Sequence, residues 1–156
     1  KYFKIMIDII CNYESSFNKL NLLEVKKIST MVLNSKNIQD GEVSFVFVSD
    51  DFLASMKKKY FNKNQYTDVI AFRLNDHEEQ KRVDGEIYIS LSMAKENAEL
   101  FEEPYEKEIV RLIIHGCLHL IGIKDKTVEE KNIMTRMEDE FLKKISWIKI
   151  VENLNE

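Results

Sequence analysis

The stretch SFVFVSDDF, Ser44 to Phe52, joins a strand to a helix and indicates the architecture of the chain. Phe45 to Val48 form a nearly unbroken apolar run, which is typical of a strand buried on both faces. Asp50 or Asp51 follows as the expected N-cap of a helix. The apolar positions of that helix are Leu53, Met56 and Tyr60. The stretch therefore predicts a strand that passes directly into a helix.

Segments on both sides of this unit continue the pattern of strands and helices. Upstream, alternating apolar residues predict a first strand, and Asn21 with Glu24 forms a capping box for a helix. The apolar residues are Ile5, Ile7 and Ile9 in the strand and Leu22, Val25, Ile28 and Val32 in the helix. Downstream, TDVIAF (Thr67–Phe72) predicts a third strand and EIYISL a fourth. The fourth strand carries Ile87, Ile89 and Leu91 on one face.

The remaining segments predict one loop and three more helices. Leu74–Asp84 is polar and aperiodic, so it is expected to be a loop, and its His77 is assigned no role. Helices are expected at about Ser92–Leu100, at about Tyr105–Ile121, and after the capping box Thr127 to Glu130. The last helix carries Ile133, Met137, Phe141 and Ile145. The predicted class is mixed α and β.

The composition predicts one soluble domain spanning residues 1–156. Hydrophobic residues make up 44% and charged residues 32%, and four glycines and one proline leave little room for linkers. Cys11 and Cys117 are a poor basis for a disulfide, so a reducing cytoplasm is expected. No apolar run approaches a membrane span. A net charge of −4 and a pI near 5.5 argue against a protein that coats nucleic acid through bulk charge.

One local basic segment stands out from this acidic background. MKKKYFNKN, Met56 to Asn64, interleaves four lysines with Tyr60 and Phe61. Such a segment can place cations on phosphates and rings on bases. It can equally be a solvated helix end, where lysines interact favourably with the helix dipole, and without other evidence this second interpretation is favoured.

The stretch HGCLHLIGIKDK, His115 to Lys126, carries the strongest chemical signal. His115 and His119 are four residues apart, so in a helix their imidazoles lie on one face. Gly122 can end that helix in a left-handed conformation and return Asp125 over the histidines. Three protein ligands with an open fourth position describe a catalytic zinc site. The alternative is a pair of satisfied core histidines; Cys117 is expected to face the core.

The spacing of these ligands equals that of the long zincin motif, in which a glutamate follows the first histidine and acts as general base. Gly116 occupies that position here. A peptidase of that type is therefore disfavoured.

The same residues resemble the signature H-G-x-L-H-L-x-G-Y-D-H of the bacterial YbeY endoribonucleases. HGCLHLIG matches its first eight positions, and YTDVIAF and DGEIYIS are similar to two strand motifs of that family, in the same order. Asp125 stands where the family usually has its third histidine, so the resemblance is to a branch with aspartate as third metal ligand. The family's usual catalytic arginine aligns with Phe61.

This resemblance implies a single α+β domain, with a four-stranded, mainly mixed sheet, about five helices, and a zinc site in a cleft beside a central helix. It implies a zinc-dependent, single-strand-specific endoribonuclease that matures the 3′ end of small-subunit ribosomal RNA and takes part in ribosome quality control. Its partners would be ribosomal RNA and the small ribosomal subunit. One zinc would be held by the three catalytic residues His115, His119 and Asp125.

Further residues are candidates for RNA contact. They are Lys57, Lys58, Lys59, Lys63 and Arg111. Arg111 lies one turn before His115 and can either touch a phosphate or pair with Glu108, and the pair is favoured. Two other functions stay open: a zinc hydrolase or peptidase, and a ribosome-associated RNA-binding module that has lost catalysis.

Overall fold

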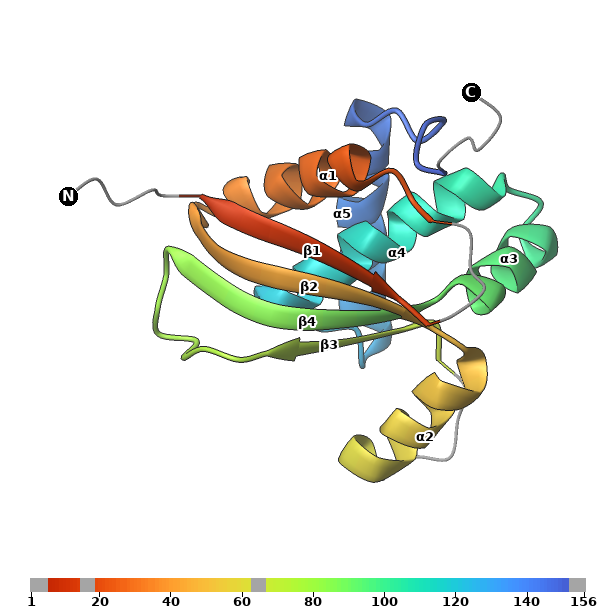
Figure 1. The fold of residues 1–156 in the computed structure, drawn as a ribbon, viewed down its shortest axis with the longest axis horizontal. Helices are drawn as coiled ribbons and strands as arrows, with labels where there is room; N and C mark the ends of the chain where they lie inside the picture. Colours follow the sequence, from red (N-terminus) through yellow and green to blue (C-terminus); the bar gives the residue numbers. More distant parts are fainter. Residues whose placement is uncertain (1–5, 15–18, 63–66, 152–156) are drawn as a thin grey trace.

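The computed structural model describes residues 6–14, 19–62 and 67–151, which form one α+β domain (Figure 1). The described elements follow the order β1 (Ile7–Tyr13), α1 (Leu22–Asn34), β2 (Asp40–Val48), α2 (Asp50–Phe61), β3 (Val69–Arg73), β4 (Arg82–Ser90), α3 (Leu91–Leu100), α4 (Tyr105–Leu120) and α5 (Val128–Lys144). The predicted α+β class, four-stranded mixed sheet and five helices are confirmed for these residues. Two sequence-based assignments, Ile5 and Lys63, lie outside them.

The four strands form one open sheet in the order β1-β2-β4-β3. β2 pairs in parallel with β1 and β4, whereas β3 runs antiparallel to β4 at the edge. Alternate side chains of the two central strands, β2 and β4, point to one face and are almost fully buried there, as the period of a strand requires. The buried side chains of β2 and β4 on this face include Val43, Phe45, Phe47, Val83, Ile87 and Ile89.

Helices α1 and α4 pack on that buried face, and α3 and α5 pack in turn on α4. Figure 1 shows α4 running behind the strands, with α5 crossing it. This places α4 at the centre of the domain, between the sheet on one side and α5 on the other.

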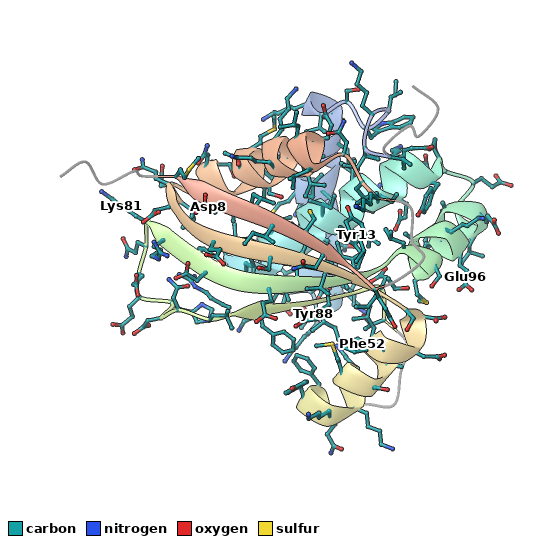
Figure 2. The ribbon with its side chains drawn as sticks, in the orientation of Figure 1. Asp8, Tyr13, Phe52, Lys81, Tyr88 and Glu96 are labelled. Atoms are coloured by element: carbon teal, nitrogen blue, oxygen red, sulfur yellow. The ribbon has the colours of Figure 1, made fainter. Side chains whose placement is uncertain are left out.

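Helix α2 covers one end of the opposite sheet face. Its Leu53 is buried in a small cluster with Val48 and Ile70. Phe52 stacks on Tyr88 of β4, with ring centroids 6.4 Å apart (Figure 2). The prediction that the end of β2 is buried on both faces is therefore confirmed, because the second face is covered by this helix.

Several sequence-based details were wrong. Leu91 begins α3 rather than continuing the fourth strand, which ends at Ser90, and Leu22 of α1 is 49% exposed. Ser49, not Asp50 or Asp51, is the N-cap of α2, since its hydroxyl accepts the Phe52 N–H at 3.1 Å. β4 begins at Arg82, inside the predicted loop, because Arg82 pairs with Asp40 of β2 at 2.8 Å and extends the ladder. Ile133 is 39% exposed. The buried positions of α5 are Met134, Glu138 and Leu142.

One other local prediction is confirmed, and a second is confirmed in part. The reciprocal capping box of Thr127 and Glu130 begins α5. Asn21 caps α1 through the N–H groups of Leu23 and Glu24, but its own N–H donates to the Ile150 carbonyl at 2.7 Å, so Glu24 does not complete the predicted box. Within the described residues, none of the helices has both the length and the apolar character that a membrane crossing requires.

Candidate metal centre

From Ile109 onward, helix α4 exposes a single narrow stripe of side chains. Most of its residues from Ile109 to Leu120 are fully buried, but Arg111, His115 and His119 are only half-buried. These three recur every four residues and therefore stack on one side of the helix. The apolar remainder packs on the sheet and the other helices, so the histidine side is fixed in its orientation.

The turn after α4 brings a carboxylate to this stripe. Gly122 adopts φ +93°, and the Gly122 and Ile123 N–H groups donate to the His119 and Leu118 carbonyls. This left-handed ending returns the chain, as predicted for Gly122. Asp125 Oδ2 then lies 3.3 Å from His115 Nε2 and 3.4 Å from His119 Nε2.

The three side chains form a group that can hold a metal ion. One potential ligand atom from each of His115, His119 and Asp125 lies within 4.8 Å of the other two. Two imidazole nitrogens and one carboxylate oxygen are a donor set that suits zinc and related divalent metals. The predicted convergence of these residues is therefore observed in the geometry.

The opposite ring nitrogens are held by hydrogen bonds. His119 Nδ1 lies 3.0 Å from the Ile123 carbonyl oxygen, and His115 Nδ1 lies 2.6 Å from Glu138 Oε2. A carbonyl oxygen can only accept, so Nδ1 of His119 is the donor and its Nε2 carries the free lone pair. Both Nε2 atoms are thus directed toward Asp125, which is the arrangement that a metal requires of its imidazole ligands.

The same contacts shift the pKa values of the three groups. Burial acts to lower the pKa of His115, but hydrogen bonds with Asp125 and Glu138 outweigh it and raise that pKa to about 9. Burial and repulsion from His115 lower the pKa of His119. The hydrogen bond from His115 lowers the pKa of Asp125 to about 2. The carboxylate therefore stays ionised and available to a cation at neutral pH.

A cleft of about 590 Å³ adjoins this group, between α3, α4, the turn and α5. Its polar lining includes Asp68, Asn97, Glu108, Lys131 and Thr135. Asn97 donates to Asp68 at 3.0 Å, which ties the TDV segment to α3. Burial raises the pKa of Glu108 to about 7 despite the neighbouring Arg111.

Sequence reasoning missed several residues of this site. Asp68 belongs to the TDVIAF motif, so a signal was present, but Asn97, Lys131 and Thr135 follow no pattern that points to a cleft. Glu138 could have been found, because it lies four residues from both Met134 and Leu142 on the same side of the helix. A charged residue between two apolar ones at that spacing indicates a buried carboxylate with a partner.

The described part of the lysine segment, Met56 to Asn62, is not part of this cleft. Of its described residues, Lys58 and Lys59 are exposed in the last turn of α2, and no described residue of α2 lines the cleft. Lys57 lies 4.8 Å from the Phe61 ring centroid, and Phe61 stacks on Phe72 of β3 at 5.9 Å. These described residues therefore lie on the other side of the edge strand, away from the cleft.

Arg111 is engaged by three carboxylates. Its Nε lies 3.6 Å from Glu108 Oε2, which confirms the predicted pair. Its Nη1 also lies 3.2 Å from Glu138 and 3.3 Å from Asp139, which the sequence did not indicate. The guanidinium is therefore neutralised within the protein.

Gly116 faces the sheet rather than the cleft. A Cβ atom at this position would meet Ile87 Cγ2 at 2.6 Å. A glutamate here would therefore clash with β4 and would point away from the metal group. This geometry removes the general base on which the zincin interpretation depends.

Comparison with known proteins gives a consistent match. The family model described as endoribonuclease YbeY matches residues 10–146. An endoribonuclease YbeY of Karelsulcia muelleri is 42% identical over 130 residues, 83% of this chain and 90% of the relative. That of Flavobacterium psychrophilum is 37% identical over 133 residues, 85% and 92% of the two chains. A solution structure of a Thermotoga maritima protein shares the fold, with a TM-score of 0.56 and 24% identity over 86% of this chain and 87% of that one.

Proposed function

The chain belongs to the YbeY family of endoribonucleases, and on that basis we propose that it cleaves ribosomal RNA with one zinc ion held by His115, His119 and Asp125. The observation that carries the metal assignment is the convergence of two Nε2 atoms and one carboxylate oxygen at the wall of a cleft. Zinc suits this donor set. When bound, it would polarise a water molecule or a phosphate oxygen during phosphodiester hydrolysis.

The chain's own residues have separable roles in this proposal. His115, His119 and Asp125 would be the catalytic residues, because they would hold the metal. Lys131 is exposed and lines the cleft, so it is placed to attract a phosphate there. The α2 segment would bind RNA beyond the cleft through Lys57, Lys58 and Lys59, with Lys63 following in the sequence. Arg111 contributes structure rather than RNA contact.

The finer substrate assignment follows the family. We propose single-stranded ribosomal RNA near the 3′ end of the small-subunit species, with the small subunit as partner, a further role in ribosome quality control, and a cytoplasmic location. The whole of residues 1–156 would act as one domain. The family membership supports these assignments.

A catalytically weak RNA-binding module is the second candidate. The specific observation in its favour is Phe61, which stands where the family's arginine aligns and whose ring stacks on Phe72. Position 61 is thus used for packing, and a phosphate contact from this position is lost.

Metal analysis combined with RNA cleavage separates the candidates. Wild-type protein should contain about one zinc per chain. It should also cut single-stranded RNA, whereas His115→Ala and His119→Ala should lose both zinc and cleavage. RNA binding without cleavage in every metal tested would favour the binding module. Casein digestion abolished by His115→Ala, with no RNA cleavage, would favour a zinc peptidase.

A further inference from the structure

Glu138 is a carboxylate in an apolar setting. It is 5% exposed and lies on α5 between Met134 and Leu142, the other two buried residues of that helix. Burying an ionised carboxylate is unfavourable unless hydrogen bonds and charges compensate it. Its partners therefore indicate why the residue is placed there.

The two oxygens of Glu138 have different partners, one turn apart on α4. Oε1 lies 3.2 Å from Arg111 Nη1, and Oε2 lies 2.6 Å from His115 Nδ1. The histidine contact is the shorter of the two, as expected for a strong charge-assisted hydrogen bond. Arg111 thus holds the carboxylate from one side and leaves the other oxygen for the imidazole. α5 crosses α4 to make these contacts (Figure 1).

Glu138 is not placed as a fourth ligand. Its contact is with Nδ1 of His115, whereas Nε2 of the same ring faces Asp125. The two nitrogens lie on different sides of the ring, so a group bound to Nδ1 is outside the coordination sphere. What it can determine is which nitrogen carries the proton and how the ring is turned.

We propose that Glu138 is a positioning residue of the metal centre: it accepts the Nδ1 proton of His115 in a hydrogen bond, so that Nε2 is left to bind the metal. Arg111 orients Glu138 for this role. The inference rests on the proposed function, because it concerns the same metal. It assigns a role to a residue 23 positions away from His115 in the sequence.

Asp139 offers a matched control on the same helix. It is an adjacent carboxylate whose side chain is 51% exposed, and its Oδ1 lies 3.3 Å from Arg111 Nη1. Asp139→Asn removes the same charge from the same helix but leaves the contact with His115 intact. A general effect of negative charge near the metal would appear in both variants.

The experiment measures zinc affinity by competition with a chelator for wild type, Glu138→Gln and Asp139→Asn. Glu138→Gln should weaken zinc binding by about 10- to 100-fold, because a neutral amide is a poorer acceptor and does not enforce the Nδ1 proton. Asp139→Asn should bind zinc like the wild type. Equal affinity of Glu138→Gln and wild type, or an equal loss in both variants, would overturn the proposal.

A second measurement does not depend on how well the variant folds. Long-range proton–nitrogen NMR of the zinc-loaded wild type should show His115 protonated at Nδ1 and bound to metal through Nε2. Its Nδ1 proton should resonate far downfield because the hydrogen bond to Glu138 is short. The opposite assignment of the two nitrogens would refute the positioning role. Wild type that binds no zinc would instead refute the proposed metal centre itself.

Discussion

Gly116→Ala tests whether the close packing of α4 on the sheet holds the metal centre in place. The added Cβ would lie 2.6 Å from Ile87 Cγ2 and 3.3 Å from Ile87 Cδ1. An ordinary contact begins at 3.4 Å, so the first pair of atoms must separate by 0.8 Å. Ile87 is fully buried in β4, which leaves the separation to a shift of α4 or of the strand.

The expected loss of stability is modest because two effects oppose each other. Overpacking of a buried site costs about 1–3 kcal/mol. Replacing glycine by alanine within a helix stabilises the folded protein by about 1 kcal/mol, because alanine has the higher helix propensity. We therefore expect the free energy of unfolding to fall by about 1 kcal/mol, measured by urea denaturation at equilibrium. Zinc affinity should also fall, since the residue lies between the two histidines.

A double-mutant cycle isolates the contact. Ile87→Ala removes Cγ2 and makes room for the new methyl group, so Gly116→Ala with Ile87→Ala should be about 1–2 kcal/mol more stable than the sum of the single changes. Ile87→Val keeps Cγ2 and should show coupling below about 0.5 kcal/mol. Additive effects of Gly116→Ala and Ile87→Ala would refute the argument that this contact sets the helix position.

Three other predictions concern the cleft and the metal group. Burial raises the pKa of Glu108 from 4.5 to about 7. The folded protein therefore holds this proton more tightly than the unfolded chain, and the free energy of unfolding of the wild type should decline as the pH rises from 4.5 to about 7. Glu108→Gln should remove that decline, which amounts to about 3 kcal/mol for a shift of this size, in urea titrations, and an unchanged pH profile would contradict the assignment. Lys131→Ala should weaken RNA binding and reduce the slope of log affinity against log salt concentration by about one unit. Lys143→Ala, which removes the same charge elsewhere on α5, should change neither quantity. Equal effects of the two variants would exclude a contact of Lys131 with RNA in the cleft. In competition with a chelator, Asp125→His should retain zinc, and Asp125→Asn should lose at least about tenfold in zinc affinity. A large loss with histidine and little loss with asparagine would show that Asp125 orients a ligand rather than binding the metal.

Local sequence signals were reliable wherever the interacting groups are close along the chain. The four-residue spacing of His115 and His119, the left-handed turn at Gly122 and the capping box at Thr127 each involve a single helix or its end. Their geometry follows from backbone preferences and helical periodicity. The same preferences were insufficient at α2, because Ser49, Asp50 and Asp51 are all residue types that cap helices well. Ser49 is the N-cap because the chain is extended there and becomes helical at Asp50.

Strand limits and buried faces were less predictable. β4 extends to Arg82 because Asp40, 42 residues earlier, pairs with it across the sheet. Ile133 looks like a core residue by type, yet the angle at which α5 meets α4 buries Met134, Glu138 and Leu142 instead. Hydrophobicity alone does not specify that angle, because a helix with several apolar positions can pack on more than one of them.

The sequence by itself determined the α+β class, the family resemblance and the three potential metal ligands, because a helix period and one glycine turn bring those ligands together within eleven residues of chain. Only the tertiary structure decided what surrounds them. Packing of α5 on α4 places Glu138 beside His115. Asp68, just before β3, meets Asn97 of α3, and the close approach of α4 to β4 turns residue 116 away from the cleft. These contacts join segments far apart in the chain, so they depend on how whole helices and strands bury their apolar faces together. A local sequence pattern does not specify that packing.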